Sequence, residues 1–224
     1  MILMEPLQRE RDYLLIIGVQ SQGYLGISKR DVLKDYNPEE SIVIDSLNIK
    51  FSIKKSKDNK KSSNKGTISV YNLSDKTVAF LSGKKLVNVS FYVGYKDSGM
   101  DSLVMGNVTS VSTQREGSDK VTTLVLDENF VAINNTSISS TIPAGKTIED
   151  VIETIRVEMS AKSQEDGGPP IAKGLYTGTR KDSKVLYGYS ITGTARQKLN
   201  EIALAYKLEW SIDNGKLNIR DGLS

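Results

Sequence analysis

The sequence contains no cysteine and no histidine among its 224 residues. Without cysteine it has no disulfide, no thiolate nucleophile and none of the commonest structural zinc sites. Without histidine it lacks the side chain that titrates nearest neutral pH, so the Ser–His–Asp arrangement of many hydrolases is excluded. Chemistry that uses a pair of carboxylates stays open, because aspartate and glutamate together number 27. The sequence has no EF-hand spacing either, and we expect no cofactor and no metal.

Long hydrophobic runs are also missing, because no apolar run approaches the roughly 18–20 residues that a membrane-spanning helix needs. The short apolar stretch Tyr13–Val19 has no long apolar core and no small-residue cleavage site, so it predicts a first strand rather than a signal peptide. A net charge of +3 is too small to indicate nucleic-acid binding by itself. A length of 224 residues indicates one or two domains.

The first half of the sequence has the alternation typical of strands. Apolar and polar residues alternate from Leu47 to Lys54, which predicts a strand with one buried face. After the pattern resumes at 66–74, Ser74 is placed to cap a short helix closed by Gly83, and Gly106 predicts a bulge or bend. About six strands joined by short turns predict a small antiparallel β-barrel for residues 1–130. The expected strands cover residues 12–20, 42–54 (as one long strand, or as two separated near Asp45-Ser46), 66–74, 86–93, 103–113 and 121–127.

The second half, residues 131–224, predicts an α+β domain with two helices on a short sheet, so that the whole chain is α+β and mainly β. Apolar residues spaced by three and four follow Thr147, which is suited to be the N-cap of the first helix. The second helix is expected after Gly193. Asn214-Gly215 between two alternating strands is a strong hairpin signal, and Trp210 is expected on the buried face of the first of them.

A lysine-rich segment joins two of the predicted strands and is the candidate site of partner contact. Its lysines are Lys54, Lys55, Lys57, Lys60, Lys61 and Lys65. The segment is suited to contact an acidic protein surface or a nucleic-acid backbone, and it is equally typical of a solvated hairpin tip. No aromatic residue is interleaved with the lysines, so stacking on bases has no platform there. For catalysis, cofactor or metal binding the sequence offers no candidate residue.

The order of these motifs resembles the baseplate hub proteins of contractile phage tails, which connect the tail tube to the central spike. In the first half the resemblance rests on I-x-V-Y-N-L-S at 68–74, V-G-Y at 93–95 and G-x-V-T-S-V at 106–111. In the second half it rests on the two helix segments, 139–152 and 190–203, and the hairpin that follows at 208–219. Each motif is weak alone, and their order carries the resemblance.

The resemblance implies a structural, non-catalytic virion component of the phage tail, made in the cytoplasm of the host bacterium. It implies ring-forming contacts with tail tube, central spike and baseplate wedge or ring proteins. It also implies a homo-oligomer, with a trimer favoured over a hexamer, and a channel that DNA crosses at most transiently. Such proteins usually continue into a second barrel, whereas this sequence stops at Ser224.

Two other functions stay open at this point. One is a peptidoglycan-cleaving tail enzyme, which would need two carboxyl groups facing each other across a cleft at roughly 5–9.5 Å. The other is a nucleic-acid-binding β-barrel that uses the lysine segment, which would show salt-sensitive binding to DNA.

Overall fold

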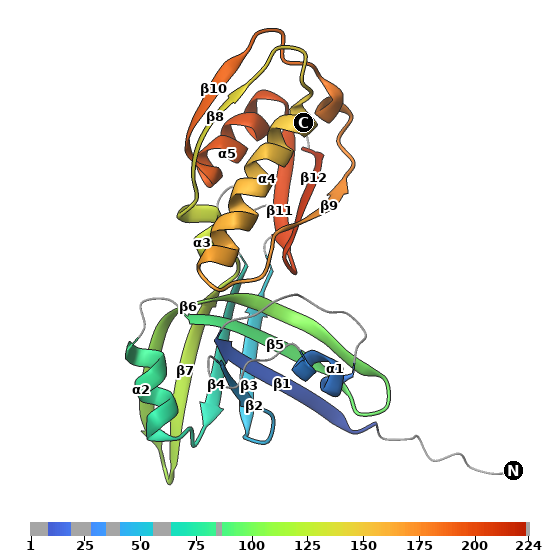
Figure 1. The fold of residues 1–224 in the computed structure, drawn as a ribbon. Helices are drawn as coiled ribbons and strands as arrows, with labels where there is room; N and C mark the ends of the chain where they lie inside the picture. Colours follow the sequence, from blue (N-terminus) through green and yellow to red (C-terminus); the bar gives the residue numbers. More distant parts are fainter. Residues whose placement is uncertain (1–8, 19–27, 35–40, 56–63, 84–86, 223–224) are drawn as a thin grey trace, which may run out of the picture.

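The computed structural model describes residues 9–18, 28–34, 41–55, 64–83 and 87–222, and every structural statement below concerns these residues. Figure 1 shows a sheet built by the first half of the chain, with a mixed helix-and-strand body above it. We call residues 9–128 the sheet unit and residues 129–222 the α+β unit. The predicted class, α+β and mainly β, is confirmed. None of the described helices is long and apolar enough to cross a membrane.

The sheet unit holds seven strands in the order β2-β1-β5-β6-β7-β4-β3, with every neighbouring pair antiparallel. The strands are β1 (Arg11–Gly18), β2 (Ser41–Ile44), β3 (Ile49–Lys54), β4 (Lys65–Tyr71), β5 (Val87–Tyr95), β6 (Gly99–Glu116) and β7 (Asp119–Asp127). The two outermost strands, β2 and β3, are consecutive in the chain and are separated only by residues 45–48. The sheet must therefore curl until its two edges meet at this short connection.

Side-chain contacts measure how strongly the sheet is rolled. The rings of Phe51 on β3 and Phe91 on β5 lie 4.9 Å apart, edge to face. These two strands are four positions apart in the sheet, which in a flat sheet would separate them by about 19 Å. Tyr13 on β1 also approaches Phe91, and its hydroxyl donates to the carbonyl of Leu47 in the connection between β2 and β3. The concave face is thus filled by side chains from both ends of the sheet.

The predicted barrel is not formed, because β2 and β3 are not paired with each other. They follow each other in the chain through residues 45–48, near the predicted break at residues 45 and 46, and form no ladder with each other. The structure has an open, strongly curled sheet instead. Its concave face carries the main core, to which β1, β2, β4, β5, β6 and β7 all contribute buried apolar residues.

Two helices flank the sheet. Helix α2 (Asp75–Gly83) starts as predicted, since the Ser74 hydroxyl accepts a hydrogen bond from the backbone N–H of Thr77 at 3.1 Å, and Leu81 enters the main core. Helix α1 (Lys29–Lys34) is not among the predicted elements. It forms because Val32 is buried against apolar residues of β1, β5 and β6 on the convex face, a contact that no local pattern reveals.

A bulge or bend was predicted at Gly106, and no bulge occurs there. The register of β6 shifts at two other places, between Phe91 and Tyr92 of its partner β5 and between its own residues Val108 and Ser110. Gly106 has a different reason to be glycine. A Cβ atom at this position would lie 2.7 Å from the carbonyl oxygen of Asp127, so β6 passes too close to the end of β7 for any side chain.

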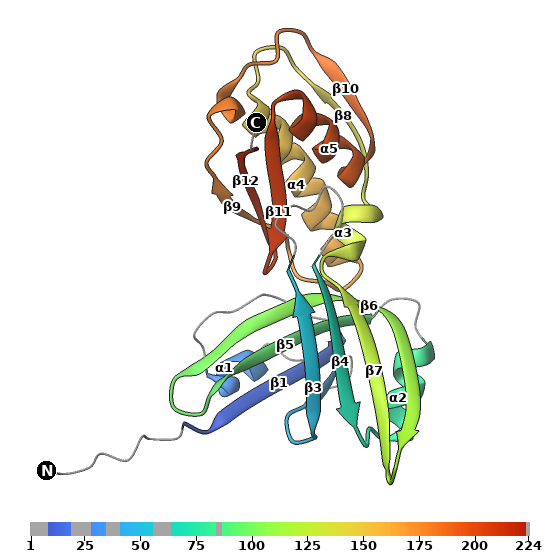
Figure 2. The ribbon, with the colours of Figure 1, turned by 180° about the vertical axis from the view of Figure 1, so that it is seen from behind.

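The α+β unit places its two long helices between a three-stranded sheet, in the order β11-β12-β9, and a two-stranded antiparallel sheet of β8 and β10 (Figure 1; Figure 2). Its elements are α3 (Phe130–Asn134), β8 (Ser137–Ile142), α4 (Ile148–Glu165), β9 (Ala172–Tyr176), a 3-10 helix (Thr179–Asp182), β10 (Tyr189–Thr194), α5 (Ala195–Ala205), β11 (Leu208–Asp213) and β12 (Lys216–Asp221). The two helices and the β11–β12 hairpin are as predicted. The sheet of β8 and β10, strand β9 and helix α3 were not predicted.

Local signals in this unit are confirmed one by one. The Thr147 hydroxyl accepts from the N–H of Asp150 at 3.1 Å and the Asp150 carboxylate accepts from the N–H of Thr147, which forms a capping box. Asn214 and Gly215 have φ angles of 50° and 72°, as the tight turn between β11 and β12 requires. The α+β unit has a core of its own, separate from those of the sheet unit. The expected division between residues 130 and 131 falls at the start of α3 and stays a prediction.

Trp210 is 1% exposed in this core, and its indole N–H donates to Asn200 Oδ1 at 3.0 Å. We predict that Trp210→Ala lowers the free energy of unfolding by about 3–5 kcal/mol, because a buried indole leaves a large cavity. Leu204→Ala on α5 is the matched control, since Leu204 is 81% exposed, and it should cost less than about 0.5 kcal/mol. Urea denaturation of the two variants makes the measurement. A loss below about 1 kcal/mol for Trp210→Ala would contradict the strand register.

Candidate functional site: the junction of the two units

The described lysines of the lysine-rich segment lie where the sheet unit meets the α+β unit. Lys54 at the end of β3 is paired in register with Lys65 at the start of β4, and Lys65 is paired with Asp127 at the end of β7. These strand ends point toward the α+β unit (Figure 1; Figure 2). Lys57, Lys60 and Lys61 lie outside the described residues. The segment therefore leaves the sheet at the junction, at the end opposite to the β6–β7 turn.

A buried carboxylate joins the two units at this junction. Glu128 directly follows β7 and is 1% exposed. Its Oε2 accepts from the side-chain N–H of Asn64 at 2.5 Å, and its Oε1 accepts from the backbone N–H of Asn214 at 2.9 Å. Its own backbone N–H donates to the carbonyl of Asn64 at 2.9 Å. We call Asn64, Glu128 and Asn214 the Glu128 latch, because they connect β4 and β7 to the turn between β11 and β12.

Other asparagines extend the connection on the far side of the junction. Asn88 on β5 donates through Nδ2 to the carbonyl of Asp166, at the end of α4, at 3.0 Å. Asn107 on β6 donates to Asn88 Oδ1 at 2.7 Å and accepts from the N–H of Val131 in α3 at 3.1 Å. The two units are thus connected by directional hydrogen bonds at two separate places, which fixes their relative orientation more tightly than apolar contact alone would.

The electrostatics of the latch come from opposing effects on Glu128. Burial raises the pKa of its carboxyl from 4.5 to about 7, since a desolvated carboxylate is costly. The hydrogen bonds from Asn64 and Asn214 and the positive charge of Lys55 lower that pKa, whereas the neighbouring Asp213 raises it. Both carboxylate oxygens accept from N–H donors, so the geometry suits the ionised form while the surroundings disfavour it. Glu128 therefore titrates close to neutral pH.

Lys55 connects this latch to the candidate partner site. Lys55 directly follows β3, is exposed, and acts on the buried carboxylate through its charge. At least one lysine of the segment therefore has an electrostatic role inside the molecule, whatever the segment contacts outside it. Sequence reasoning missed Glu128 entirely, because the Asp127-Glu128 pair after a strand has the pattern of an ordinary exposed turn.

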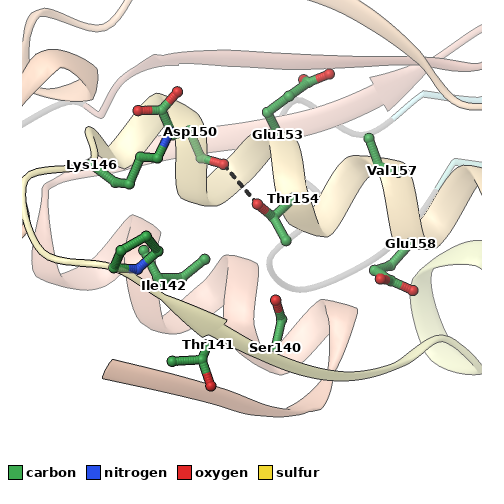
Figure 3. A pocket seen from close by; sticks show the side chains of 10 residues that line it. Ser140, Thr141, Ile142, Lys146, Asp150, Glu153, Thr154, Val157 and Glu158 are labelled. Carbon is green, nitrogen blue, oxygen red and sulfur yellow. Dashed lines mark hydrogen bonds between the residues drawn. The ribbon is translucent and has the colours of Figure 1, made fainter. Parts of the chain in front are cut away.

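A second feature is a hollow of about 400 Å³ between α4 and β8, shown in Figure 3. The carboxyl groups that line it, those of Asp150, Glu153 and Glu158, all come from α4, and the opposite wall is formed by β8 and Pro143. Hydrogen bonds from Thr147 lower the pKa of Asp150, and Arg156 binds Glu153 at 2.6 Å. The hollow thus has no carboxyl pair facing across a cleft, which is the arrangement that the peptidoglycan-cleaving alternative requires.

The fold is similar to those of known tail proteins. It matches the tail protein of Neisseria meningitidis MC58 with a TM-score of 0.52, 13% identity and coverage of 92% of this chain and 50% of the other. It matches the 43 kDa tail protein of prophage MuSo2 from Shewanella oneidensis with a TM-score of 0.53, 10% identity and coverage of 95% and 56%. It matches the lidded Francisella PdpA–VgrG complex with a TM-score of 0.50, 7% identity and coverage of 98% and 30%.

No protein-family profile and no curated protein matches the sequence. The chain spans about half the length of the two tail proteins and less than a third of the matched VgrG-complex chain. At identities of 7–13% these likenesses show the fold alone. At the level of the fold, the resemblance to phage tail proteins inferred from the order of the motifs is confirmed.

The latch generates a prediction about pH. Above about pH 4.5 the unfolded chain releases the Glu128 proton while the folded chain keeps it until about pH 7, so rising pH favours unfolding. The folded and unfolded pKa values of Glu128 differ by about 2.5, and each pKa unit corresponds to about 1.4 kcal/mol, so the free energy of unfolding should fall by about 3 kcal/mol across this pH range. In Glu128→Gln this slope should disappear, although the amide costs stability at all pH values by placing an N–H group opposite a donor.

The measurement is urea denaturation of wild type and Glu128→Gln at a series of pH values from about 4.5 to about 8. The difference in unfolding free energy between the two should shrink as the pH rises. Glu165→Gln is the matched control, because Glu165 is an exposed residue at the end of α4, and it should follow the wild-type slope. Parallel curves for wild type and Glu128→Gln would contradict the raised pKa.

Proposed function

We propose that this chain is a structural component of a phage tail baseplate or a related injection machine, and that it joins the tail tube to spike or baseplate proteins through ring-forming contacts. One observation carries the proposal. The sheet unit and the α+β unit together, over 92–95% of the chain, share the fold of two phage tail proteins. A match that spans both units supports a common arrangement of two bodies and not merely a common small motif.

The junction supports an adaptor role on physical grounds. An adaptor transmits position between two partners, so its own two parts have to keep a fixed orientation. The buried Glu128 latch and the Asn88–Asn107 connection supply this orientation through directional hydrogen bonds. Breaking a buried, hydrogen-bonded carboxylate away from its donors is costly, which opposes hinge motion between the units.

We also propose that the ring surrounds the channel that the resemblance to hub proteins implies, and that the convex face of β3, β4, β6 and β7 borders it. Several residues that alternate with the core positions on these strands carry short hydroxyl side chains or lysines, for example Ser52, Lys50 and Ser112, which are exposed, although Val125 on β7 is an exposed apolar exception. Ser69 and Thr123 on this face bond each other at 3.0 Å. Small hydroxyl groups and a few cations offer DNA a smooth, weakly attractive wall without the aromatic platforms that would hold bases.

Assembly is the first test. We predict that the purified chain forms a closed ring, a trimer or a hexamer, or that it enters one with other tail proteins. Native mass spectrometry of the chain alone, and of tail particles from cells that produce it, makes the measurement. A protein that is monomeric in solution at all concentrations and also absent from purified particles would refute the proposal.

The lysine segment is the second test. Neutralising Lys55, Lys57, Lys60 and Lys61 with glutamine should weaken assembly if the segment contacts an acidic neighbour, and added salt should weaken wild-type assembly in the same way. The free energy of unfolding should change by less than about 1 kcal/mol, since exposed charges contribute little. Sedimentation at low and high salt measures both effects.

Two further variants make the result specific. A variant with Lys55 retained separates the effect on Glu128 from the effect on a partner. A control with the same loss of charge replaces four exposed lysines elsewhere, namely Lys76, Lys184, Lys207 and Lys216. If the variant with Lys55, Lys57, Lys60 and Lys61 replaced by glutamine assembles like wild type, and this control does too, the lysine segment is a solvated hairpin end with no partner.

A further inference from the structure

Three polar residues form a row across β3, β4 and β7, at the ends of these strands that face the α+β unit (Figure 1). They are Lys55, Asn64 and Glu128, and each lies one residue beyond the last register pair of its strand. The backbone N–H of Glu128 donates to the carbonyl of Asn64 at 2.9 Å, so the pairing of β4 with β7 continues into the row. Lys55 and Asn64 occupy the corresponding next position of the pairing between β3 and β4.

The row continues the core face of the sheet. Each of its residues lies two positions from a core-facing residue of the same strand, namely Ile53, Gly66 or Leu126. Residues two positions apart on a strand share a face, so the alternation places the whole row on one side of the sheet. The burial of Asn64, which is 0% exposed, and of Glu128 agrees with this placement. A lysine amine and an asparagine amide are therefore neighbours on one face.

The amide of Asn64 is held on carboxylates. Its Nδ2 donates to Glu128 Oε2 at 2.5 Å and to Asp213 Oδ1 at 3.0 Å. A carboxyl group in contact with an amide nitrogen can give it a proton, which is the step that makes this nitrogen a leaving group. A pKa of about 7 suits Glu128 both to accept and to return a proton near neutral pH.

Lys55 supplies a nucleophile beside this amide. Residues directly opposite each other in an antiparallel pair have Cβ atoms about 4.5–5.5 Å apart, a gap that the four methylenes of a lysine can cross to reach Cγ of Asn64. The charge of Lys55 lowers the pKa of Glu128, which agrees with an ammonium group on the same side as the carboxylate. Lys55 is exposed and has no ion pair with any described residue, so its side chain is able to turn inward.

We propose that Lys55 and Asn64 form an intramolecular amide bond, with Glu128 as the catalytic residue. The neutral amine of Lys55 attacks Cγ of Asn64 and forms the new C–N bond. Glu128 accepts the proton that the amine loses and passes a proton to Nδ2 of Asn64. The bond between Cγ and Nδ2 then breaks, and ammonia leaves. The product joins β3 to β4 covalently at the junction, and the proposal does not depend on the tail role.

The reaction is one slow event for each molecule. Reacting groups held side by side behave as if each were present at about 10⁵ M or more. Against this, the amine must lose its proton first, and the usual lysine pKa of about 10.4 means that few lysine amines are neutral at pH 7. The carboxylates of Glu128 and Asp213 attract the ammonium form and slow the attack further. The rate should therefore rise with pH.

The test is the intact mass of the full chain, followed over several days by mass spectrometry after refolding from urea. The folded chain should lose the mass of one ammonia molecule, or show this loss from the start if the bond formed before purification. A loss that develops during the measurement should be at least about tenfold faster at pH 8 than at pH 6, since the neutral fraction of a lysine grows about tenfold per pH unit. Chains that start with full mass and stay in urea should keep it.

Tandem mass spectrometry of a proteolytic digest locates the bond. The fragments that contain Lys55 and Asn64 should be joined to each other. This step is needed because a succinimide at Asn214, which precedes Gly215, loses the same mass. An amide between Lys55 and Asp213 would lose water instead of ammonia.

Variants identify the groups that react. Lys55→Arg keeps the charge without a comparable nucleophile, and Asn64→Ala removes the amide, so both should keep their full mass. Glu128→Gln should slow the reaction at least about a hundredfold, because an amide cannot carry the proton. Lys54→Arg is the matched control, since Lys54 alternates to the other face of β3, and it should lose ammonia like wild type. Circular dichroism checks that each variant is folded.

Two results would overturn the proposal whatever the variants do. One is a folded wild-type chain that keeps its full mass after days at pH 8, and the other is a mass loss found only at Asn214 or Asp213. A third contrary result is ammonia loss in Lys55→Arg at the wild-type rate. If Glu128→Gln does not fold, Lys55→Arg still decides the outcome, because it changes only an exposed side chain.

Discussion

The arrangement of this protein depends on how one carboxylate is held away from water. Glu128 is buried where β7 ends, and its two oxygens take donors from different parts of the chain, one from Asn64 before β4 and one from the turn at Asn214. A buried carboxylate is tolerated only when its acceptors are filled. One donor lies in each unit, so the hydrogen bonds that stabilise the buried Glu128 carboxylate also fix the orientation of the two units.

The pairing of neighbouring strands brings these groups to one place. Because β7, β4 and β3 are direct neighbours in the sheet, the end of β3, the start of β4 and the end of β7 lie together on the side of the α+β unit, next to Glu128. The roll of the sheet is a separate constraint: β2 and β3 are consecutive and also outermost, so the sheet curls until Phe51 reaches Phe91. The close passage of β6 at Gly106 tightens the same corner, because only glycine allows the backbone of β6 to approach Asp127.

A feature could be predicted from the sequence when the residues that cause it lie close together along the chain. The caps at Ser74 and Thr147 and the turn at Asn214 act within four residues, and all three were predicted and are confirmed. The core position of Trp210 followed from alternation on one strand. Helix α1, strand β9 and the order of the large sheet depend on partners far away in the chain, and no local pattern contains them. Glu128 was missed for the same reason, since its partners are 64 and 86 positions away.

The lack of histidine takes on a different meaning once the junction is known. A chain without histidine has no side chain whose ordinary pKa lies near neutrality. Burial moves Glu128 into that range instead, and Lys55 of the lysine segment opposes the shift through its charge. The state of the latch therefore depends on a balance at the junction: burial and Asp213 raise the pKa of Glu128, and the hydrogen bonds from Asn64 and Asn214 and the charge of Lys55 lower it. Because these groups come from both units, the environment that sets this pKa exists only while the two units are held together.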